Sequence, residues 1–190
     1  PKVLRELWEV LDRDPVLVAE CLARPILADR LVRNWYAFDD RFHGDVRARA
    51  ESELDTRGTV HGMQATSGRY EERVWRRGGE AKAADRTPGD PQMRILGEEE
   101  WRAEIARLHE AFGLEVAVQG AGLAGLPIRM MTSLQEDESS FHVMAVLETD
   151  ADQLKVATVS WPKVSFDEWW DATRTSLPPA LPAGPASDAE

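Results

Sequence analysis

Few of the residues whose side chains could do chemistry lie close together in this sequence. The histidines are scattered, at His43, His61, His109 and His142. None of them has a second metal ligand at the spacing that zinc sites use. Cys21 is the only cysteine, so neither an internal disulfide nor a thiolate cage around a metal can form. We therefore expect no metal and no cofactor, and we expect Cys21 to be buried and inert on an apolar helix face.

Three glycines have the spacing of a dinucleotide-binding motif. Gly120, Gly122 and Gly125 follow the pattern Gly-x-Gly-x-x-Gly, in which backbone amides approach a pyrophosphate. That motif has to open a helix inside a βαβ unit. Here Pro127 follows in a stretch without helical periodicity, and no Ser-His-Asp elbow is visible elsewhere. The sequence therefore does not predict a nucleotide site.

The composition limits the classes of partner. The chain has 190 residues, of which 43% are hydrophobic and 30% charged, which is typical of a globular protein with a core. Its net charge of -11, without a basic stripe, argues against nucleic acid, whose phosphates require clustered Lys and Arg. No run approaches the roughly 20 apolar residues of a membrane span, so we expect no integral membrane segment. The start at Pro1 leads us to expect a processed chain or a fragment.

Residues 1–58 are predicted to form a helical arm of three helices. Asp14-Pro15 gives an N-cap followed by proline at the first position of the second helix. Pro25 is expected to start the third, in which apolar residues recur in steps of three and four through residues 31–54. Because the opposite face is charged, this helix should bury one side only.

Residues 59–176 are predicted to form a small domain, so the fold class is α+β, with an antiparallel sheet packed by helices. Strand formers are frequent in residues 70–76, and residues 98–112 form an amphipathic helix with Gly113 as its C-cap glycine. The strongest strand signal is the alternation in residues 141–148, which a turn joins to a second strand at 153–161.

The connecting segments carry weaker signals. Ser165 and Glu168 have the spacing of a capping box, so a short helix should follow, and Trp169 and Trp170 should fold it back onto the sheet. Three further predictions are a loop over residues 78–91, a short strand over 114–118, and a disordered Pro/Ala-rich tail or linker over 177–190.

One segment resembles the C-terminal signature of parvulin-type peptidyl-prolyl isomerases. It runs from Gly125 to Glu148 (GLPIRMMTSLQEDESSFHVMAVLE), and the match needs no gaps after Met131. Met131 falls on a family position that lines the proline pocket, and Phe141-His142 falls on the strand that carries the family's histidine. The layout of a helical arm, such a domain and a trailing helix is similar to that of the SurA-type chaperones.

The resemblance implies an isomerase or foldase that acts on unfolded, proline-containing polypeptides. Rotation of the peptide bond meets a barrier of about 20 kcal/mol from amide resonance, and a pocket lowers it by favouring the twisted amide, without covalent chemistry. By resemblance, Met131, Phe141 and Leu134 would wall this pocket, and His142 would belong to a hydrogen-bonded network in its floor. Gln135 and Glu136 would contact the substrate.

Simpler interpretations of these residues stay open. Met131 and Phe141 fit a plain core, His142 fits a structural histidine, and the acidic run that begins at Glu136 fits a solvated loop. Residues 70–76 lack the histidine found on the family's first strand, and Glu136 stands where a phenylalanine is common. The alternative function is therefore a catalytically degenerate parvulin-like domain that serves as a protein-binding or structural interaction module.

Localisation and assembly follow from the resemblance or are left open. SurA-type proteins act outside the cytoplasm, so the resemblance implies an extracytoplasmic, periplasmic or secreted protein. A third possibility is an interaction subunit whose helices in residues 1–54 dock onto a larger assembly. The sequence does not determine the oligomeric state.

Overall fold

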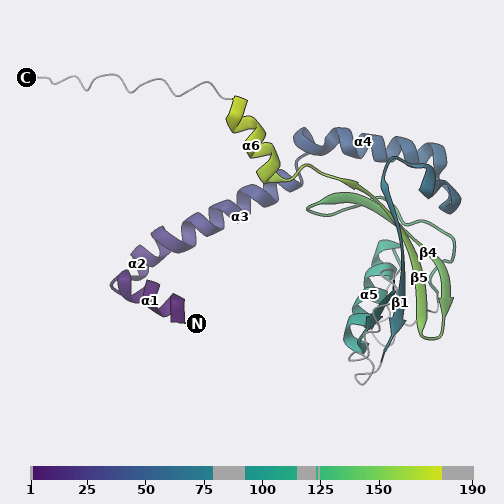
Figure 1. Cartoon of the computed structure of the whole chain (residues 1–190), viewed down its shortest axis with the longest axis horizontal. Coiled ribbons are helices and arrows are strands. Elements are labelled where there is room, and N and C mark those ends of the chain that lie inside the picture. Colours follow the sequence, from purple (N-terminus) through teal and green to yellow (C-terminus); the bar gives the residue numbers. More distant parts are fainter. Residues whose placement is uncertain (1, 79–92, 115–122, 124, 177–190) are drawn as a thin grey trace, which may run out of the picture.

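The computed structural model describes residues 2–78, 93–114, 123 and 125–176, and it confirms the α+β class. Figure 1 shows a long helical arm that projects from a sheet with helices on both of its faces. We call residues 2–38 the arm and residues 40–162 the sheet domain.

The arm contains one short helix and one long, locally distorted helix. Helix α1 (Lys2–Val10) is followed by a turn in which Asp12 and Arg13 have positive φ angles of 55° and 58°. Helix α2 (Pro15–Val18), the π-helical turn η1 (Ala19–Ala23) and helix α3 (Arg24–Ala37) then run on as one element. The predicted separate helix from Pro25 is therefore wrong. Pro25 has no N–H for the Cys21 carbonyl, and the wider turn, in which Arg24 N–H bonds Ala19 O, accommodates it inside the helix.

The predicted third helix also breaks where the sequence pattern ran on. Phe38 ends α3, and Asp39 adopts an extended conformation (φ -93°, ψ 117°). The Asp39 carboxylate accepts a hydrogen bond from Arg41 N (2.9 Å), which caps the new helix α4 (Asp40–Arg57). A local cap thus overrides the apolar periodicity, and α4 leaves in a different direction.

The sheet has five strands in the order β2-β1-β5-β4-β3. Strands β4 (Ser140–Asp150) and β5 (Gln153–Pro162) form the predicted hairpin, with Phe141 opposite Trp161. The other strands are β1 (Arg69–Arg77), β2 (Met93–Leu96) and β3 (Gln135–Glu136). The pair β1–β2 is parallel, so the sheet is mixed and the prediction of an antiparallel sheet is wrong at this edge.

Helices cover both faces of the sheet. Helix α5 (Glu98–Ala111) packs Trp101, Ile105 and Leu108 against one face, where the strands contribute Leu96, Val146, Leu154 and Val156. The other face is covered by α4 and the 3-10 helix η2 (Val60–Ala65), and its core comprises Ala50, Met63, Val143, Ala145, Ala157, Val159 and Trp161. The second half of the predicted arm, α4, therefore packs on the sheet.

The predicted helix ends are found at both later helices. Gly113, with a φ of +67°, follows α5. The Ser165–Glu168 capping box opens α6 (Phe166–Ser176), since Glu168 N donates to Ser165 Oγ and Ser165 N donates to Glu168 Oε2. The prediction that Trp169 folds this helix onto the sheet is wrong. Its ring lies 5.2 Å from that of Tyr36 and 5.0 Å from that of Phe42, at the root of the arm.

Some predictions fall outside the described residues. They are most of the loop at 78–91, the strand at 114–118, most of the glycine motif at 120–125 and the tail at 177–190. Within the described ranges, none of the helices is long and apolar enough to cross a membrane.

Candidate functional site

The residues predicted to form the proline pocket lie on the sheet but do not share one face. Phe141, in β4, is 1% exposed and buried on the side of α4. Met131 pairs with Ala145 and, like Leu134, packs against the core on that side. His142 is the next residue along β4, so its side chain points to the opposite face. Met131, Leu134 and Phe141 thus lie on the α4 side of the sheet, and His142 is separated from them. The burial of Phe141 confirms its interpretation as a core residue.

The predicted substrate contacts, Gln135 and Glu136, form the short edge strand β3. Gln135 is opposite His142, and its side-chain amide donates to Ser133 Oγ (2.8 Å). Both carboxylate oxygens of Glu136 are engaged, one with Lys163 Nζ (2.8 Å) and the other with Arg47 (2.6 Å). Glu136 therefore anchors the fold, and its interpretation as part of a solvated loop is wrong.

A buried lysine, which the sequence did not single out, holds this corner of the molecule together. The side chain of Lys163 is 1% exposed, and its ammonium donates to Glu136 Oε1, to Ala37 O (2.6 Å) and to Asp137 O (2.7 Å). It also lies 4.6 Å from the ring centre of Phe141. Because all three donors are used, this lysine joins the end of α3 to the β3–β4 turn and has none left for a substrate.

A second unpredicted feature is a buried histidine beside this lysine. His43 is fully buried in α4, and neither ring nitrogen has a partner in hydrogen-bond geometry among the described residues. Burial and the nearby charge of Lys163 lower the pKa of His43, and the Tyr36 backbone and the carboxylates of Glu136 and Asp39 oppose this shift only in part. The imidazole is therefore held neutral at the junction of arm and sheet domain.

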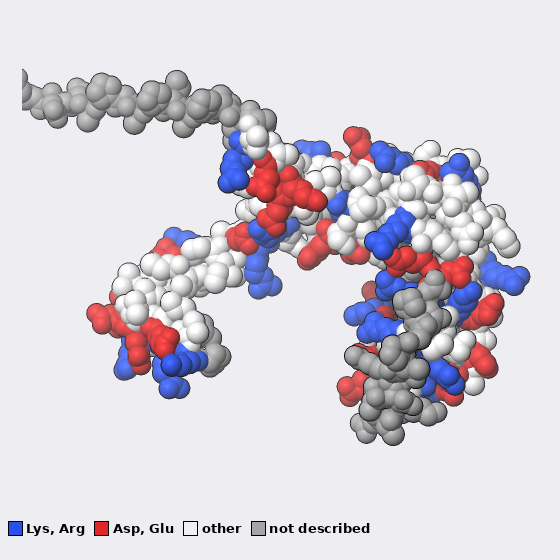
Figure 2. Space-filling model, viewed as in Figure 1, with Lys and Arg blue, Asp and Glu red and all other residues white. Residues whose placement is uncertain are grey.

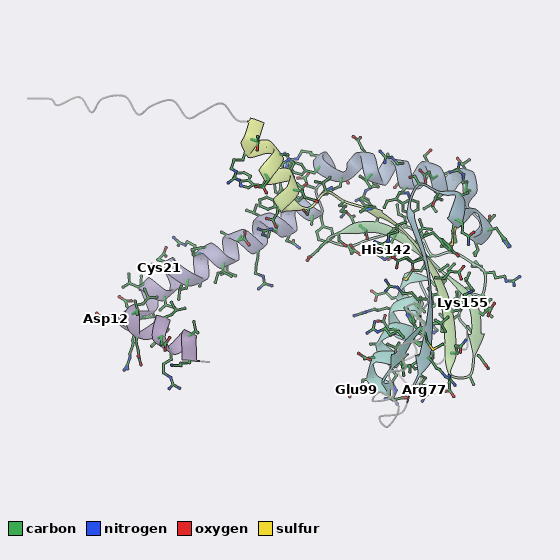
Figure 3. All side chains as sticks on the ribbon, viewed as in Figure 1. Asp12, Cys21, Arg77, Glu99, His142 and Lys155 are labelled. Atoms are coloured by element: carbon green, nitrogen blue, oxygen red, sulfur yellow. The ribbon has the colours of Figure 1, made fainter. Side chains whose placement is uncertain are left out.

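His142 itself lies against an acidic turn. Its Nδ1 is 3.5 Å from Asp137 Oδ2, without hydrogen-bond geometry, and Asp137 also accepts bonds from Ser139 N (2.7 Å) and Ser140 N (2.8 Å). Burial opposes ionisation of Asp137, but these hydrogen bonds, together with the nearby His142 imidazole, keep the pKa of Asp137 below its ordinary value. The arrangement orders the β3–β4 turn. Figure 3 shows His142 on the sheet, far from Cys21 on the arm.

The arm presents its apolar side chains to solvent. Leu31 is 68% exposed and Trp35 52% exposed, and Leu27 and Phe38 complete the series at steps of four, four and three residues. We call these four residues the α3 apolar face. Figure 2 shows the surface along α3 as largely uncharged. Cys21 is exposed on the same arm, so the expectation that it is buried is wrong, because the arm does not fold back onto the sheet domain.

A cleft of about 830 Å³ lies at the root of the arm. One wall is the side of α3 that carries Leu27, Arg30, Leu31 and Asn34, and the other is the segment before and at the start of α6, with Val164 and Phe166. We call it the arm-root cleft. Leu27 and Leu31 belong both to this cleft and to the α3 apolar face, so the two surfaces are continuous.

A smaller cleft of about 240 Å³ lies between η2, β1 and the end of β4. Two of its polar groups are engaged with neighbours, since Tyr70 Oη donates to Glu72 (2.6 Å) and Glu72 pairs with Lys155 (2.7 Å). Neither this cleft nor the arm-root cleft is lined by Met131, Phe141 or His142.

The described residues contain no cluster of three side chains placed to hold a metal ion. Comparison with models of protein families, with curated proteins and with solved structures gives no match for this chain. The surfaces that remain as candidates for function are the α3 apolar face and the arm-root cleft.

Proposed function

We propose that the protein is a polypeptide-binding interaction module of the foldase or chaperone kind, in which the arm holds unfolded segments of other proteins. The observation that carries this proposal is the exposure of the α3 apolar face, together with further exposed apolar residues on α1 and α2. Contiguous apolar surface of this kind is uncommon on a protein that has no partner, because its exposure to water is unfavourable.

The charge distribution supports a partner that is recognised by apolar contact. Residues 1–38 contain six Lys and Arg and six Asp and Glu, so the whole net charge of -11 lies on residues 39–190. A neutral arm neither attracts nor repels a polypeptide at long range, whereas an acidic body keeps the complex soluble. Unfolded segments, which expose apolar side chains, are the partner class that fits such a surface.

Of the two functions that the sequence leaves open, isomerase and protein-binding module, we favour the protein-binding module. An isomerase needs a concave, apolar site for the proline ring. Phe141 is sealed in the core beneath Arg47 and Lys163, at 5.0 Å and 4.6 Å from its ring centre, and His142 faces the other side of the sheet. The isomerase activity stays a prediction from the resemblance.

Binding can be measured by fluorescence anisotropy with a labelled, permanently unfolded polypeptide. The double variant Leu31→Gln/Trp35→Gln removes the centre of the α3 apolar face and should weaken binding by tenfold or more, on the order of 1.4 kcal/mol. Its matched control is Ile128→Gln/Met130→Gln, which changes two comparably exposed apolar side chains on the sheet domain and should leave the affinity unchanged. Equal losses in the two variants would contradict the proposal.

The catalytic alternative is tested on Xaa-Pro peptides by exchange NMR or a protease-coupled assay. We expect no acceleration above the uncatalysed rate, which is on the scale of tens of seconds or slower. Acceleration that disappears in His142→Ala would replace the proposed function by the isomerase.

A further inference from the structure

The arm-root cleft has a charge balance unlike that of the protein as a whole. Among the described residues, its lining includes Arg30, Arg33 and Lys163 but only one acidic residue, Glu138, although the chain carries a net charge of -11. Figure 2 shows charged side chains gathered where α6 meets α3, beside a largely uncharged stretch of α3. A cation in such a lining can bind a ligand with negative charge if the protein's own carboxylates leave it without a partner.

Two of these three cations are already neutralised. Arg33 pairs with Asp29 (2.9 Å) and with Asp167 (2.8 Å), and these hydrogen bonds lower the pKa of Asp167. Lys163 is buried in its own cluster with Glu136. The cation that remains for a ligand is therefore Arg30, on the α3 wall.

Arg30 has a polar neighbour that is also without a partner. Its guanidinium forms no ion pair and no hydrogen bond with another described residue, and the same holds for the side-chain amide of Asn34. The two residues are four positions apart, so they lie on one face of α3, and both line the cleft. Together they offer N–H donors that a carboxylate can accept.

The remainder of the cleft suits apolar side chains. Leu27 and Leu31 lie beside Arg30 on α3, and Val164 and Phe166 form the facing wall. The ring of Phe166 is held in place, since the Arg33 guanidinium lies 5.0 Å from its centre. A volume of about 830 Å³ is sufficient for several side chains of an extended segment.

We propose that the arm-root cleft binds a polypeptide segment that carries a carboxylate next to apolar side chains, with Arg30 and Asn34 on the carboxylate and Leu27, Leu31, Val164 and Phe166 around the apolar groups. This inference rests on the proposed function and names the class of segment that the arm selects. The Glu138 carboxylate makes no ion pair or hydrogen bond with another described residue, and its charge disfavours a second carboxylate in the cleft. The site therefore distinguishes an apolar segment with one acid from a strongly acidic one.

The test uses the full chain and short blocked peptides of leucine and alanine with a central glutamate or, as the counterpart, a central glutamine. The glutamate peptide should bind about fivefold more tightly, the upper range for a solvent-exposed ion pair. A third peptide, with glutamine and a free C-terminal carboxylate, separates a side-chain carboxylate from a chain end. Sodium chloride should reduce the advantage, because salt screens exposed charges.

Two variants assign the effect to the cleft. Arg30→Gln should abolish the preference for glutamate and leave binding of the glutamine peptide unchanged, so the proposed function would survive the loss. Glu138→Gln should strengthen binding of the glutamate peptide about twofold by removing a like charge. Arg102→Gln, on α5 and far from the cleft, is the control and should change neither affinity.

The outcomes separate the inference from the proposed function. If both peptides bind equally and Arg30→Gln has no effect, the inference is overturned while polypeptide binding stands. If neither peptide nor the unfolded polypeptide binds, the proposed function fails as well. Light scattering at the same concentrations tests whether a second copy of the chain occupies the cleft. If the protein is a dimer that Arg30→Gln converts to a monomer, the inference is overturned.

Discussion

The arm and the sheet domain use apolar residues in opposite ways. In the sheet domain, Ile105 and Leu108 of α5 are buried against the strands, whereas Leu31 and Trp35 of α3 face solvent. A buried side chain of this size stabilises the fold by about 1.5–3 kcal/mol, and an exposed one contributes almost nothing until a partner covers it. The difference indicates that the sheet domain is stabilised by its own core, while the apolar side chains of the arm contribute little to the stability of the isolated chain.

Lys163 lies at the boundary of these two regions, and a large effect is expected there. Lys163→Met removes an ammonium that bonds Glu136, Ala37 O and Asp137 O, and it leaves a half-buried carboxylate with one partner fewer. Loss of one member of a buried ion pair costs about 3–5 kcal/mol, and because Glu136 retains Arg47 we expect the lower end. The free energy of unfolding, measured in urea, checks this value.

The matched control is Lys155→Met. Lys155 also pairs with a glutamate, Glu72, at 2.7 Å, but both side chains of that pair are partly solvated. Its removal should cost no more than about 1 kcal/mol, since water screens the pair. Equal losses of unfolding free energy in the two variants would show that Lys163 does not stabilise the contact between the arm and the sheet domain more than an ordinary surface ion pair would.

Leucine-to-alanine substitutions on the two kinds of helix test the comparison most directly. Leu108→Ala, at a position 1% exposed, should lower the free energy of unfolding by about 2–5 kcal/mol because it leaves a cavity in the core. Leu31→Ala, the same change on α3, should stay within about 0.5 kcal/mol. A large loss from Leu31→Ala would mean that the arm packs against the sheet domain in solution.

The sequence predicted the regions in which local pattern and fold agree. The alternation of residues 141–148, the helix at 98–112 and the Ser165–Glu168 cap are each set by residues near one another in the chain, and each is found. The parallel edge strand β2, whose four residues give too short a signal, was missed. Periodicity located the apolar stripe on α3, but the prediction that this stripe is buried is wrong, because its side chains are exposed.

The candidate site was less accessible to sequence reasoning, because its members are far apart in the chain. Lys163 bonds to Ala37 and Glu136, which are 126 and 27 positions away in the sequence, and no local motif predicts these contacts. In the sequence, Arg30 does not differ from other arginines on a charged helix face. The structure distinguishes it, because Arg33 and Lys163 form ion pairs with described residues and Arg30 does not. The pocket expected around Phe141 and His142 was implied by the family resemblance, and the structure buries Phe141 on one face of the sheet while His142, the next residue, points to the other.

A pH effect of intermediate size should come from His43. Its pKa is lowered in the folded protein by burial and by Lys163, so below the ordinary value of about 6.5 the unfolded chain binds a proton that the folded protein does not. Stability should therefore fall as the pH is lowered below about 6.5, by at most about 1.4 kcal/mol per pH unit from this group.

Carboxylates whose pKa values are lowered, such as Asp39 and Asp137, lose their contribution in a different window, as the pH falls below their ordinary value of 3.8. The slope of unfolding free energy between pH 6.5 and 5 is consequently the signature of the histidine. His43→Phe should flatten that slope, and an unchanged slope would show that His43 is not held neutral at the junction.

The smallest effect is expected at the cap of α2, and it shows whether the two regions unfold together. Asp14 Oδ1 accepts hydrogen bonds from Val16 N (2.8 Å) and Leu17 N (3.4 Å). Asp14→Ala should lower the local stability of this helix by about 1 kcal/mol, whereas Asp14→Asn, which still caps, should not. Amide hydrogen exchange should therefore quicken at Val16 and Leu17 in the alanine variant and stay unchanged in β4 and β5. If exchange in the strands quickened to the same extent, the arm and the sheet domain would unfold as one cooperative unit.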